Sequence, residues 1–218
     1  MQNRILEEEL EELQFEILRM GALVEKVIYE SIKSLMDDQV DLANGVIAGD
    51  DEIDRLNTDV QDKCLRLLAL RQPLAVDLRT IQTDLQIATD LERMGDYAEC
   101  IAKSTIRLHG RRTMSAFFQL PQISEKVREL VHDTITAYVL ADVEMAKKSV
   151  LLEQEIDGLF GEYFDTLSDT IKNDASVTDM AVQLLFSGHY LERIADHATN
   201  MGESVLYMVT GERTSLND

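Results

Sequence analysis

Apolar residues recur every three or four positions along almost the whole chain, which is the period of an amphipathic α-helix. The first such run begins near Asn3 and continues for about nine helical turns. Its apolar positions are Leu6, Leu10, Leu13, Ile17, Met20, Val24, Val27, Ile28, Ile32 and Leu35. No segment alternates strictly between apolar and polar residues, as a half-buried β-strand does, so the pattern predicts an all-α fold.

Turn-forming residues divide this pattern into six predicted helices. The first turn is expected at residues 37–38, and Pro73 opens the third helix, because proline is tolerated only in the first turn. Gly110 is a stop signal after the third helix. The predicted helices cover roughly residues 3–36, 40–70 (with a bend at Gly49), 73–108, 122–141, 143–172 and 174–211.

The second half of the chain repeats the plan of the first. The phrase DLERMGDYA at 90–98 returns as YLERIADHA at 190–198, an offset of 100 residues. The acidic residues of the preceding helix align at an offset of 103, and we attribute the difference to an extra loop around residues 71–73. The repeat predicts two tandem three-helix bundles, residues 1–110 and 122–218. A linker at 111–121 joins them, in which Phe117 and Phe118 are expected to pack into a groove.

Charge and composition narrow the possible partners and the compartment. The chain has 41 acidic and 21 basic residues, a net charge of −20, which argues against binding nucleic acid or an anionic membrane surface. No apolar stretch is long enough to span a bilayer, and the first ten residues show no apolar signal region. Two cysteines, Cys64 and Cys100, are expected to be buried and reduced, so we expect a cytoplasmic protein.

Pairs of acidic residues four apart occupy matching places in the two halves. Such residues lie on one helix face and repel each other by a few tenths of a kcal/mol. One pair carries no weight at this acidic content, but four pairs in register predict a bound cation. Carboxylates with few nearby His or Cys are hard oxygen ligands for a metal. The predicted ligands are Asp50, Asp54, Glu92, Asp96, Glu99, Glu153, Asp157, Glu192 and Asp196.

The acidic faces are expected to point away from each half's core, and the two faces of one half to meet along a groove. His197 adjoins Asp196 but is expected to be solvated. Glu129-x-x-His132 matches half of the ferritin-like di-iron pattern, which needs a second copy that the last helix lacks. A ferritin-like site is therefore not expected.

Motifs for common enzyme chemistry are missing from the sequence. It contains no Walker A loop, no dinucleotide-binding glycine fingerprint and no Gly-x-Ser-x-Gly elbow. These absences predict no organic cofactor, and the leading prediction, a non-enzymatic regulator, comes from the family resemblance given next. Two alternatives remain open: a di-metal carboxylate enzyme that activates water, which requires an open coordination position, and a generic helical adaptor.

Several phrases in this chain resemble the PhoU family of phosphate-specific transport system accessory proteins, over essentially its whole length. They are Met20-Gly21, GDDEID at 49–54, QPLAVDLR at 72–79, DLERMGDYA at 90–98 and YLERIADHATNMGE at 190–203. The second half departs from the first in lacking the QPLAVDLR phrase, with Asp179 in place of Arg79, and in having Thr199 in place of Glu99.

The resemblance implies a cytoplasmic, often dimeric regulator of phosphate uptake and a negative regulator of the phosphate-starvation response. It implies protein–protein contact with the phosphate ABC transporter ATPase and with a phosphate sensor histidine kinase. It also implies multinuclear iron or zinc on (Glu/Asp)-x-x-x-Asp motifs. In this chain those motifs are Asp50/Asp54, Glu92/Asp96, Glu153/Asp157 and Glu192/Asp196.

Overall fold

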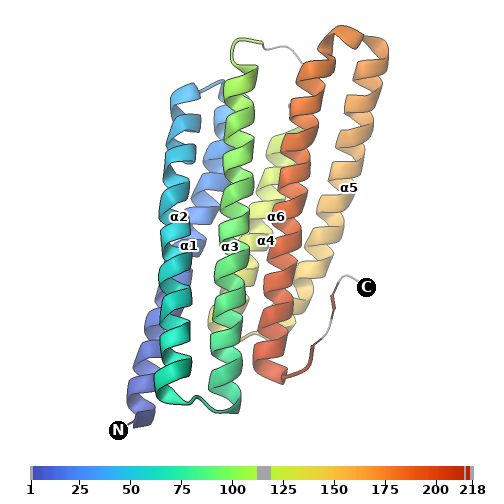
Figure 1. Ribbon diagram of the computed structural model, residues 1–218. Coiled ribbons are helices and arrows are strands. Elements are labelled where there is room, and N and C mark those ends of the chain that lie inside the picture. The colour runs from blue at the N-terminus through green and yellow to red at the C-terminus, as the bar shows by residue number, and fades with distance from the viewer. Residues whose placement is uncertain (1, 112–118, 214, 217–218) are drawn as a thin grey trace.

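The computed structural model describes residues 2–111, 119–213 and 215–216. Within these residues the chain forms six long helices and a short 3-10 turn, and no strand (Figure 1). The elements are α1 (Gln2–Asp37), α2 (Val40–Arg71), α3 (Ala75–Leu108), α4 (Leu120–Leu140), α5 (Val143–Asn173), η2 (Ala175–Val177) and α6 (Thr178–Thr210). The predicted all-α fold of two three-helix units is confirmed.

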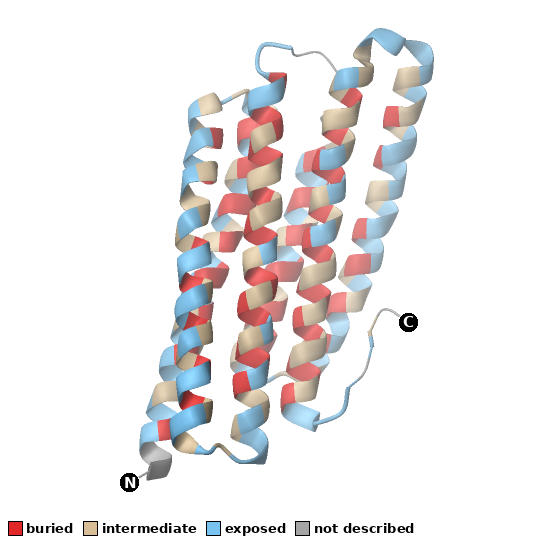
Figure 2. Cartoon of the chain, in the orientation of Figure 1, coloured by how far each residue is buried: buried red, intermediate tan, exposed pale blue. Residues whose placement is uncertain are grey.

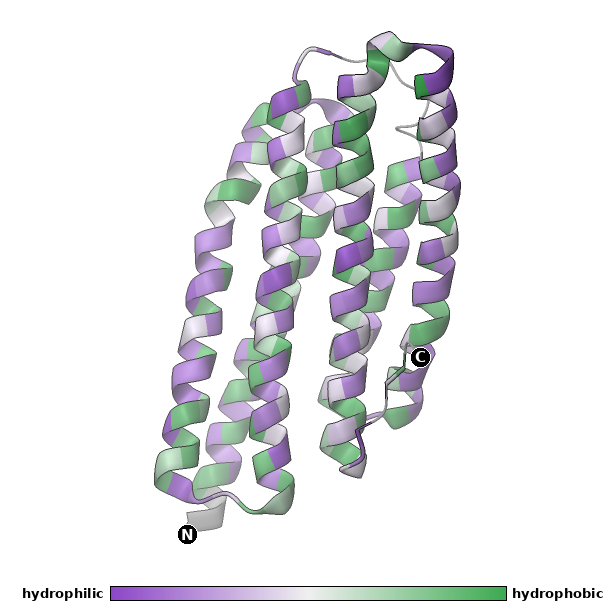
Figure 3. Ribbon diagram, turned by 45° about the vertical axis from the view of Figure 1, so that its right-hand side comes forward, coloured by the Kyte–Doolittle hydropathy of each residue, from purple (hydrophilic) through white to green (hydrophobic). Residues whose placement is uncertain are grey.

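The helices form two layers. Helices α2, α3, α6 and α5 lie side by side in the front of Figure 1, and α1 and α4 lie behind them. The two halves meet where α3 packs along α6 and where α1 packs along α4. The whole assembly shares one continuous hydrophobic core, drawn from all six helices, while the outward faces are polar (Figures 2 and 3).

Helices α3 and α6 run antiparallel, and an approximate twofold axis between them relates the two halves. Near one end of this interface Thr83 Oγ1 donates to the Ser204 carbonyl at 3.2 Å. At the other end Arg107 Nη1 donates to Gln183 Oε1 at 3.3 Å. Rotation about this axis exchanges α2 with α5 and α3 with α6, all of which belong to the front layer. The acidic residues of both halves therefore lie on the same side of the molecule.

The structure corrects the predicted cause of the offset between the repeats. The connection between the second and third helices is shorter in the first half, residues 72–74, than in the second, residues 174–177. Instead, α3 begins 17 residues before Glu92, whereas α6 begins 14 residues before Glu192. The extra residues of the first half therefore lie in helix α3, not in a loop. Of the predicted linker, residues 112–118, including Phe117 and Phe118, fall outside the described residues, and α4 already begins at Leu120.

Candidate metal centre between helices α2 and α3

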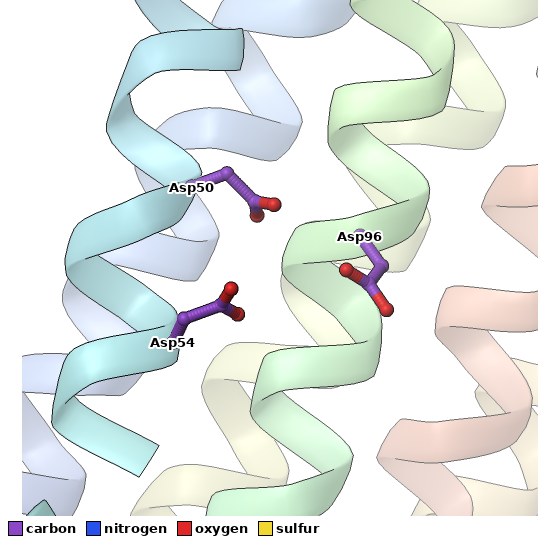
Figure 4. Close-up of side chains that lie close together, drawn as sticks. All are labelled: Asp50, Asp54 and Asp96. Carbon is purple, nitrogen blue, oxygen red and sulfur yellow. The ribbon is translucent and has the colours of Figure 1, made fainter. Parts of the chain in front are cut away.

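Three carboxylates converge in the groove between α2 and α3. Asp50 and Asp54 project from α2 toward Asp96 on α3 (Figure 4). One oxygen from each lies within 4.8 Å of the others, and no ligand-capable group outside this trio joins a comparable cluster in the described part of the chain. The predicted meeting of two acidic faces along a groove therefore holds for the first half.

The close approach of α3 to α2 depends on Gly95. A Cβ placed there would lie 3.1 Å from Ile53 Cδ1 and 3.2 Å from Asp50 Oδ1. Ile53, buried between the two aspartates of α2, anchors that helix in the core. A glycine on one helix and a buried isoleucine on the other thus bring Asp50 and Asp96 together, because helices pack closer where side chains are small.

The cluster carries more negative charge than its surroundings compensate. Burial, together with repulsion from Asp54, Glu99, Asp96 and Glu92, raises the pKa of Asp50 to about 7. Burial and the Asp96 charge likewise raise the pKa of Asp54. Burial, followed by Asp96, raises the pKa of Glu92, although Arg93 acts in the opposite direction. A group of carboxylates that resists ionisation without a counter-ion is suited to binding a cation.

Two cationic side chains of the described residues, Arg93 and Lys103, contact carboxylates beside this cluster. Arg93 Nη1 lies 3.1 Å from Asp96 Oδ2, and Arg93 Nε lies 3.6 Å from Glu92 Oε2. Lys103 hydrogen-bonds Glu99 one turn further along α3. Among the described residues no Lys, Arg or His forms an ion pair with Asp50 or Asp54, so the α2 side of the groove depends on solvent or a bound ion for charge compensation.

The carboxylates of the second half are arranged differently. Burial, then Glu192 and Asp196, raise the pKa of Asp157, so these three groups share one electrostatic neighbourhood. His189 Nδ1 lies 2.8 Å from Glu192 Oε2, and Arg193 Nη1 lies 2.7 Å from Asp196 Oδ2. The Arg193–Asp196 pair repeats the Arg93–Asp96 pair of the first half, whereas His189 corresponds there to Thr89.

Glu153 contradicts the expectation that the acidic faces point into solvent. Its side chain is buried on α5, on the stripe that packs against α6. There α6 comes unusually close, since a Cβ on Gly202 would lie 2.9 Å from Ser149 Oγ, one turn before Glu153. The other predicted ligands are exposed or half-buried along the groove edges.

His197 was expected to be solvated, and this expectation is wrong. Its Nδ1 lies 2.9 Å from Asp90 Oδ1, and the two side chains are only 16% and 4% exposed. The pair joins α6 to α3 at the interface between the halves, near Glu92. The repeat contained a signal for this contact. At the offset of 100 residues, Asp90 corresponds to Tyr190 and His197 to Tyr97, and these two tyrosines also meet, with their ring centroids 5.9 Å apart.

The remaining candidates have ordinary structural roles. His132 Nδ1 lies 3.2 Å from Glu25 on α1, and Glu129 accepts from Lys126 at 3.2 Å, so no ferritin-like pair forms. Both cysteines are free: Cys64 is buried as expected, whereas Cys100 is half-buried. No described helix has an apolar stretch of membrane-spanning length.

The donor set of the first cluster fits a hard divalent cation. Metal–oxygen bonds of about 2.0–2.6 Å place the oxygens around one ion at most about 4–5 Å apart, which agrees with the spacing here. The three converging ligands are all carboxylates, with no His or Cys among them. Such a set suits iron, manganese, magnesium or calcium better than zinc, whose protein sites favour nitrogen and sulfur.

Comparison with known proteins places this arrangement in a family. The family model described as the PhoU domain matches residues 17–105 and again residues 120–205, one match per half. The chain belongs to the PhoU family. The two matched segments correspond to the two three-helix units, and the PhoU motifs Glu92/Asp96 and Glu192/Asp196 fall within them.

Relatives of known name extend over the same length. The phosphate-specific transport system accessory protein PhoU homolog of Clostridium acetobutylicum is 37% identical over 219 residues, covering 100% of both chains. The homolog of that name from Aquifex aeolicus is 37% identical and covers 94% of this chain and 92% of its own. The crystal structure of PhoU from Pseudomonas aeruginosa has a TM-score of 0.91 at 30% identity, covering 94% of this chain and 99% of that one. The crystal structure of the phosphate transport system regulatory protein PhoU from Streptococcus pneumoniae has a TM-score of 0.90 at 28% identity, covering 96% and 99%.

Proposed function

We propose that this protein is a non-enzymatic regulator of a phosphate-specific transport system, with a cation-binding carboxylate groove on its front face. The support for the regulatory role is that relatives named as accessory and regulatory PhoU proteins match the chain from end to end. The observation that carries the role of the groove is the convergence of Asp50, Asp54 and Asp96 within 4.8 Å.

The regulator acts in the cytoplasm as a homodimer by protein–protein contact. Its partners are the ATPase of the phosphate ABC transporter and a phosphate sensor histidine kinase, and the result is restrained phosphate uptake and repression of the phosphate-starvation response. The net charge of −20 supports partners that present basic surfaces. A bound cation, iron in the first instance, neutralises part of the groove and so changes which surface a partner meets.

The cation supplies charge neutralisation and a fixed geometry; the chain supplies the ligands and their spacing. Asp50, Asp54 and Asp96 are the ligands of the first site, and Glu92 and Glu99 lie close enough to raise the pKa of Asp50. In the second half, Asp157, Glu192 and Asp196 form a weaker site, because the described residues there do not bring three ligand oxygens within 4.8 Å of one another. Glu153 supports this second group from its buried position on α5.

A complementation experiment tests this proposal. A strain lacking the gene is supplied with the wild-type protein, with Asp50→Asn/Asp54→Asn/Asp96→Asn, or with the matched control Asp41→Asn/Asp59→Asn/Asp62→Asn. The control removes the same number of negative charges, all from exposed positions on α2. Repression of a phosphate-starvation reporter, elemental analysis of protein purified without chelator, and binding to the purified transporter ATPase are measured for each.

We expect the wild-type and control proteins to contain metal, bind the ATPase and repress the reporter, while the groove variant loses all three. A metal-free wild-type protein whose ATPase binding equals that of the groove variant would reject the cation-dependent part. An unaltered phosphate-starvation response in the deletion strain would reject the regulatory role itself.

A further inference from the structure

A second groove lies behind the carboxylate layer, between α1 and α4, and both basic and acidic side chains line it. The groove has a volume of about 370 Å³. Two cationic side chains line it, Lys33 from α1 and Arg128 from α4. In a chain with a net charge of −20, two cations gathered in one cavity stand apart from their surroundings.

Both cations converge on the ring of Tyr29. Lys33 Nζ lies 5.7 Å from the ring centroid, and Arg128 Cζ lies 5.1 Å from it. Tyr29 itself is 47% exposed, so the ring and its two cations face the open groove and not the core. Cation–π contact orients the two side chains but leaves their N–H groups available to hydrogen-bond a ligand.

Neither cation is neutralised by a carboxylate in the described part of the chain. Lysines on the same two helices are paired: Lys26 with Glu30 at 3.9 Å and Lys126 with Glu129 at 3.2 Å. Lys33 and Arg128 form no such ion pair within 4.0 Å among the described residues, although Asp37 and Glu125 also line the groove. In addition, Arg128 Nε is buried without a hydrogen-bond partner. A buried guanidinium N–H without an acceptor points to a ligand that supplies one.

Further donors face the same space from α4. The hydroxyl of Ser124, one turn before Arg128, lines the groove from a buried position. Ser124 is the fifth residue of α4, just after its first turn, and the N-cap residue Gln119 makes no side-chain capping bond. An uncapped helix N-terminus attracts anions through its backbone N–H groups and its dipole.

We propose that this groove binds a phosphoryl group, held by Arg128, Lys33 and the Ser124 hydroxyl at the N-terminus of α4. Donors that approach from two helices suit a tetrahedral oxyanion, because a phosphate presents oxygens in several directions and a guanidinium pairs with two of them at once. Besides the carboxylates Asp37 and Glu125, the groove is lined by the apolar or aromatic side chains of Ile32, Met36 and Tyr29. They favour a phosphate monoester with an apolar body over the free phosphate ion.

Calorimetric titration of the full chain tests this inference. Inorganic phosphate and phenyl phosphate are titrated separately into protein stripped with chelator, in a phosphate-free buffer of low ionic strength. Removing the metal ensures that any phosphate bound is not held by the carboxylate groove. We expect 1:1 binding of both ligands, with phenyl phosphate the tighter. Tighter binding of inorganic phosphate would also support the site and would identify the free ion as its ligand.

Two matched variants decide whether the groove is responsible. Lys33→Gln/Arg128→Gln is expected to weaken binding at least tenfold, whereas Lys26→Gln/Lys126→Gln, with the same change in net charge, is expected to leave it within twofold. Arg128→Lys keeps the charge without the planar fork and should weaken binding severalfold, which provides a test if the double variant does not fold. Absence of binding at millimolar ligand, or an equal loss in the two double variants, would overturn the inference. Because binding is measured on the isolated protein, its failure is distinct from failure of the proposed regulatory role.

Discussion

The buried carboxyl of Asp84 contributes to the pH dependence of this protein's stability, and Asp84→Asn is expected to remove that contribution. The side chain lies on α3 and is fully buried. Tyr138 on α4 donates its hydroxyl proton to Oδ1 at 2.6 Å, while Oδ2 is buried without a partner. Burial raises the pKa of Asp84 to about 7, although the Tyr138 hydrogen bond acts in the opposite direction.

The sign follows from the protons bound in each state. Between pH 4 and pH 7 the folded protein keeps the Asp84 proton while the unfolded chain, with a pKa near 3.8, has released it. Stability therefore falls as pH rises through this window and levels off above pH 7. A shift of about 3 units corresponds to about 4 kcal/mol at the plateau, and about 2.5 kcal/mol of that change falls between pH 5 and pH 8.5.

Asparagine is neutral at every pH in this range and still accepts the Tyr138 hydrogen bond. Its amide N–H groups lack an acceptor, which costs about 1–3 kcal/mol at all pH values. The free energy of unfolding of Asp84→Asn relative to wild type should therefore improve by about 2.5 kcal/mol from pH 5 to pH 8.5. In a domain of this size that is a relative gain of roughly 5–10 °C in Tm.

The assay is urea unfolding of both proteins at pH 5, 6.5 and 8.5, followed by helical circular dichroism. Tyr138→Phe serves as the control: it removes the donor that favours the carboxylate, so its stability should fall more steeply with pH than that of wild type. Cys64, the other titratable group near Asp84, does not interfere, because burial raises the pKa of its thiol to about 12. A stability difference between Asp84→Asn and wild type that stays constant across the three pH values would refute the reasoning.

Four further outcomes are expected. Gly95→Ala places a methyl group against Asp50, and metal affinity measured by calorimetry should fall, whereas an unchanged affinity would contradict the role of this glycine. Gly188→Ala, whose Cβ would lie 2.6 Å from the ring of Tyr163, should lose about 1–3 kcal/mol in denaturant unfolding. Gly158→Ala, whose Cβ would meet nothing within 4 Å, should raise the free energy of unfolding by about 0.5–1 kcal/mol. If Gly158→Ala were instead the less stable of these two variants, packing around the glycine would be excluded as the cause. Removing the metal with a chelator should lower the free energy of unfolding by up to about 3 kcal/mol, and with it the Tm, but leave the helical circular dichroism signal unchanged. Loss of that signal would show that the fold needs the ion.

The helices were the most predictable part of this protein. Their boundaries follow from local signals: Pro73 and Gly110 punctuate the apolar period, and the observed α3 runs from Ala75 to Leu108. The prediction was wrong about the extra residues of the first half, which it assigned to a loop and the structure shows to be helical. Sequence counting gives the number of residues between two motifs, but it does not say which side of a helix boundary they lie on.

The carboxylate groove was partly predictable. The spacing of Asp50 and Asp54 placed both on one face of α2, because residues four apart share a face. Whether that face met Asp96 depended on how closely α2 and α3 pack, and a single glycine, Gly95, allows the approach. The same spacing in the second half led to a different result, with Glu153 buried and the other carboxylates near His189 and Arg193.

The sequence by itself determined the helical period, the repeat, the acidic pairs and the family, since each is a property of residues near one another along the chain or of their order. Only the tertiary structure decided which helices are neighbours across the twofold axis. It thereby placed His197 on Asp90 and Tyr138 on Asp84, and it gathered Lys33 and Arg128 around Tyr29. The contacts of His197, Tyr138 and Arg128 join residues 54–107 positions apart on different helices, and their formation depends on packing of the whole core, which no local pattern encodes.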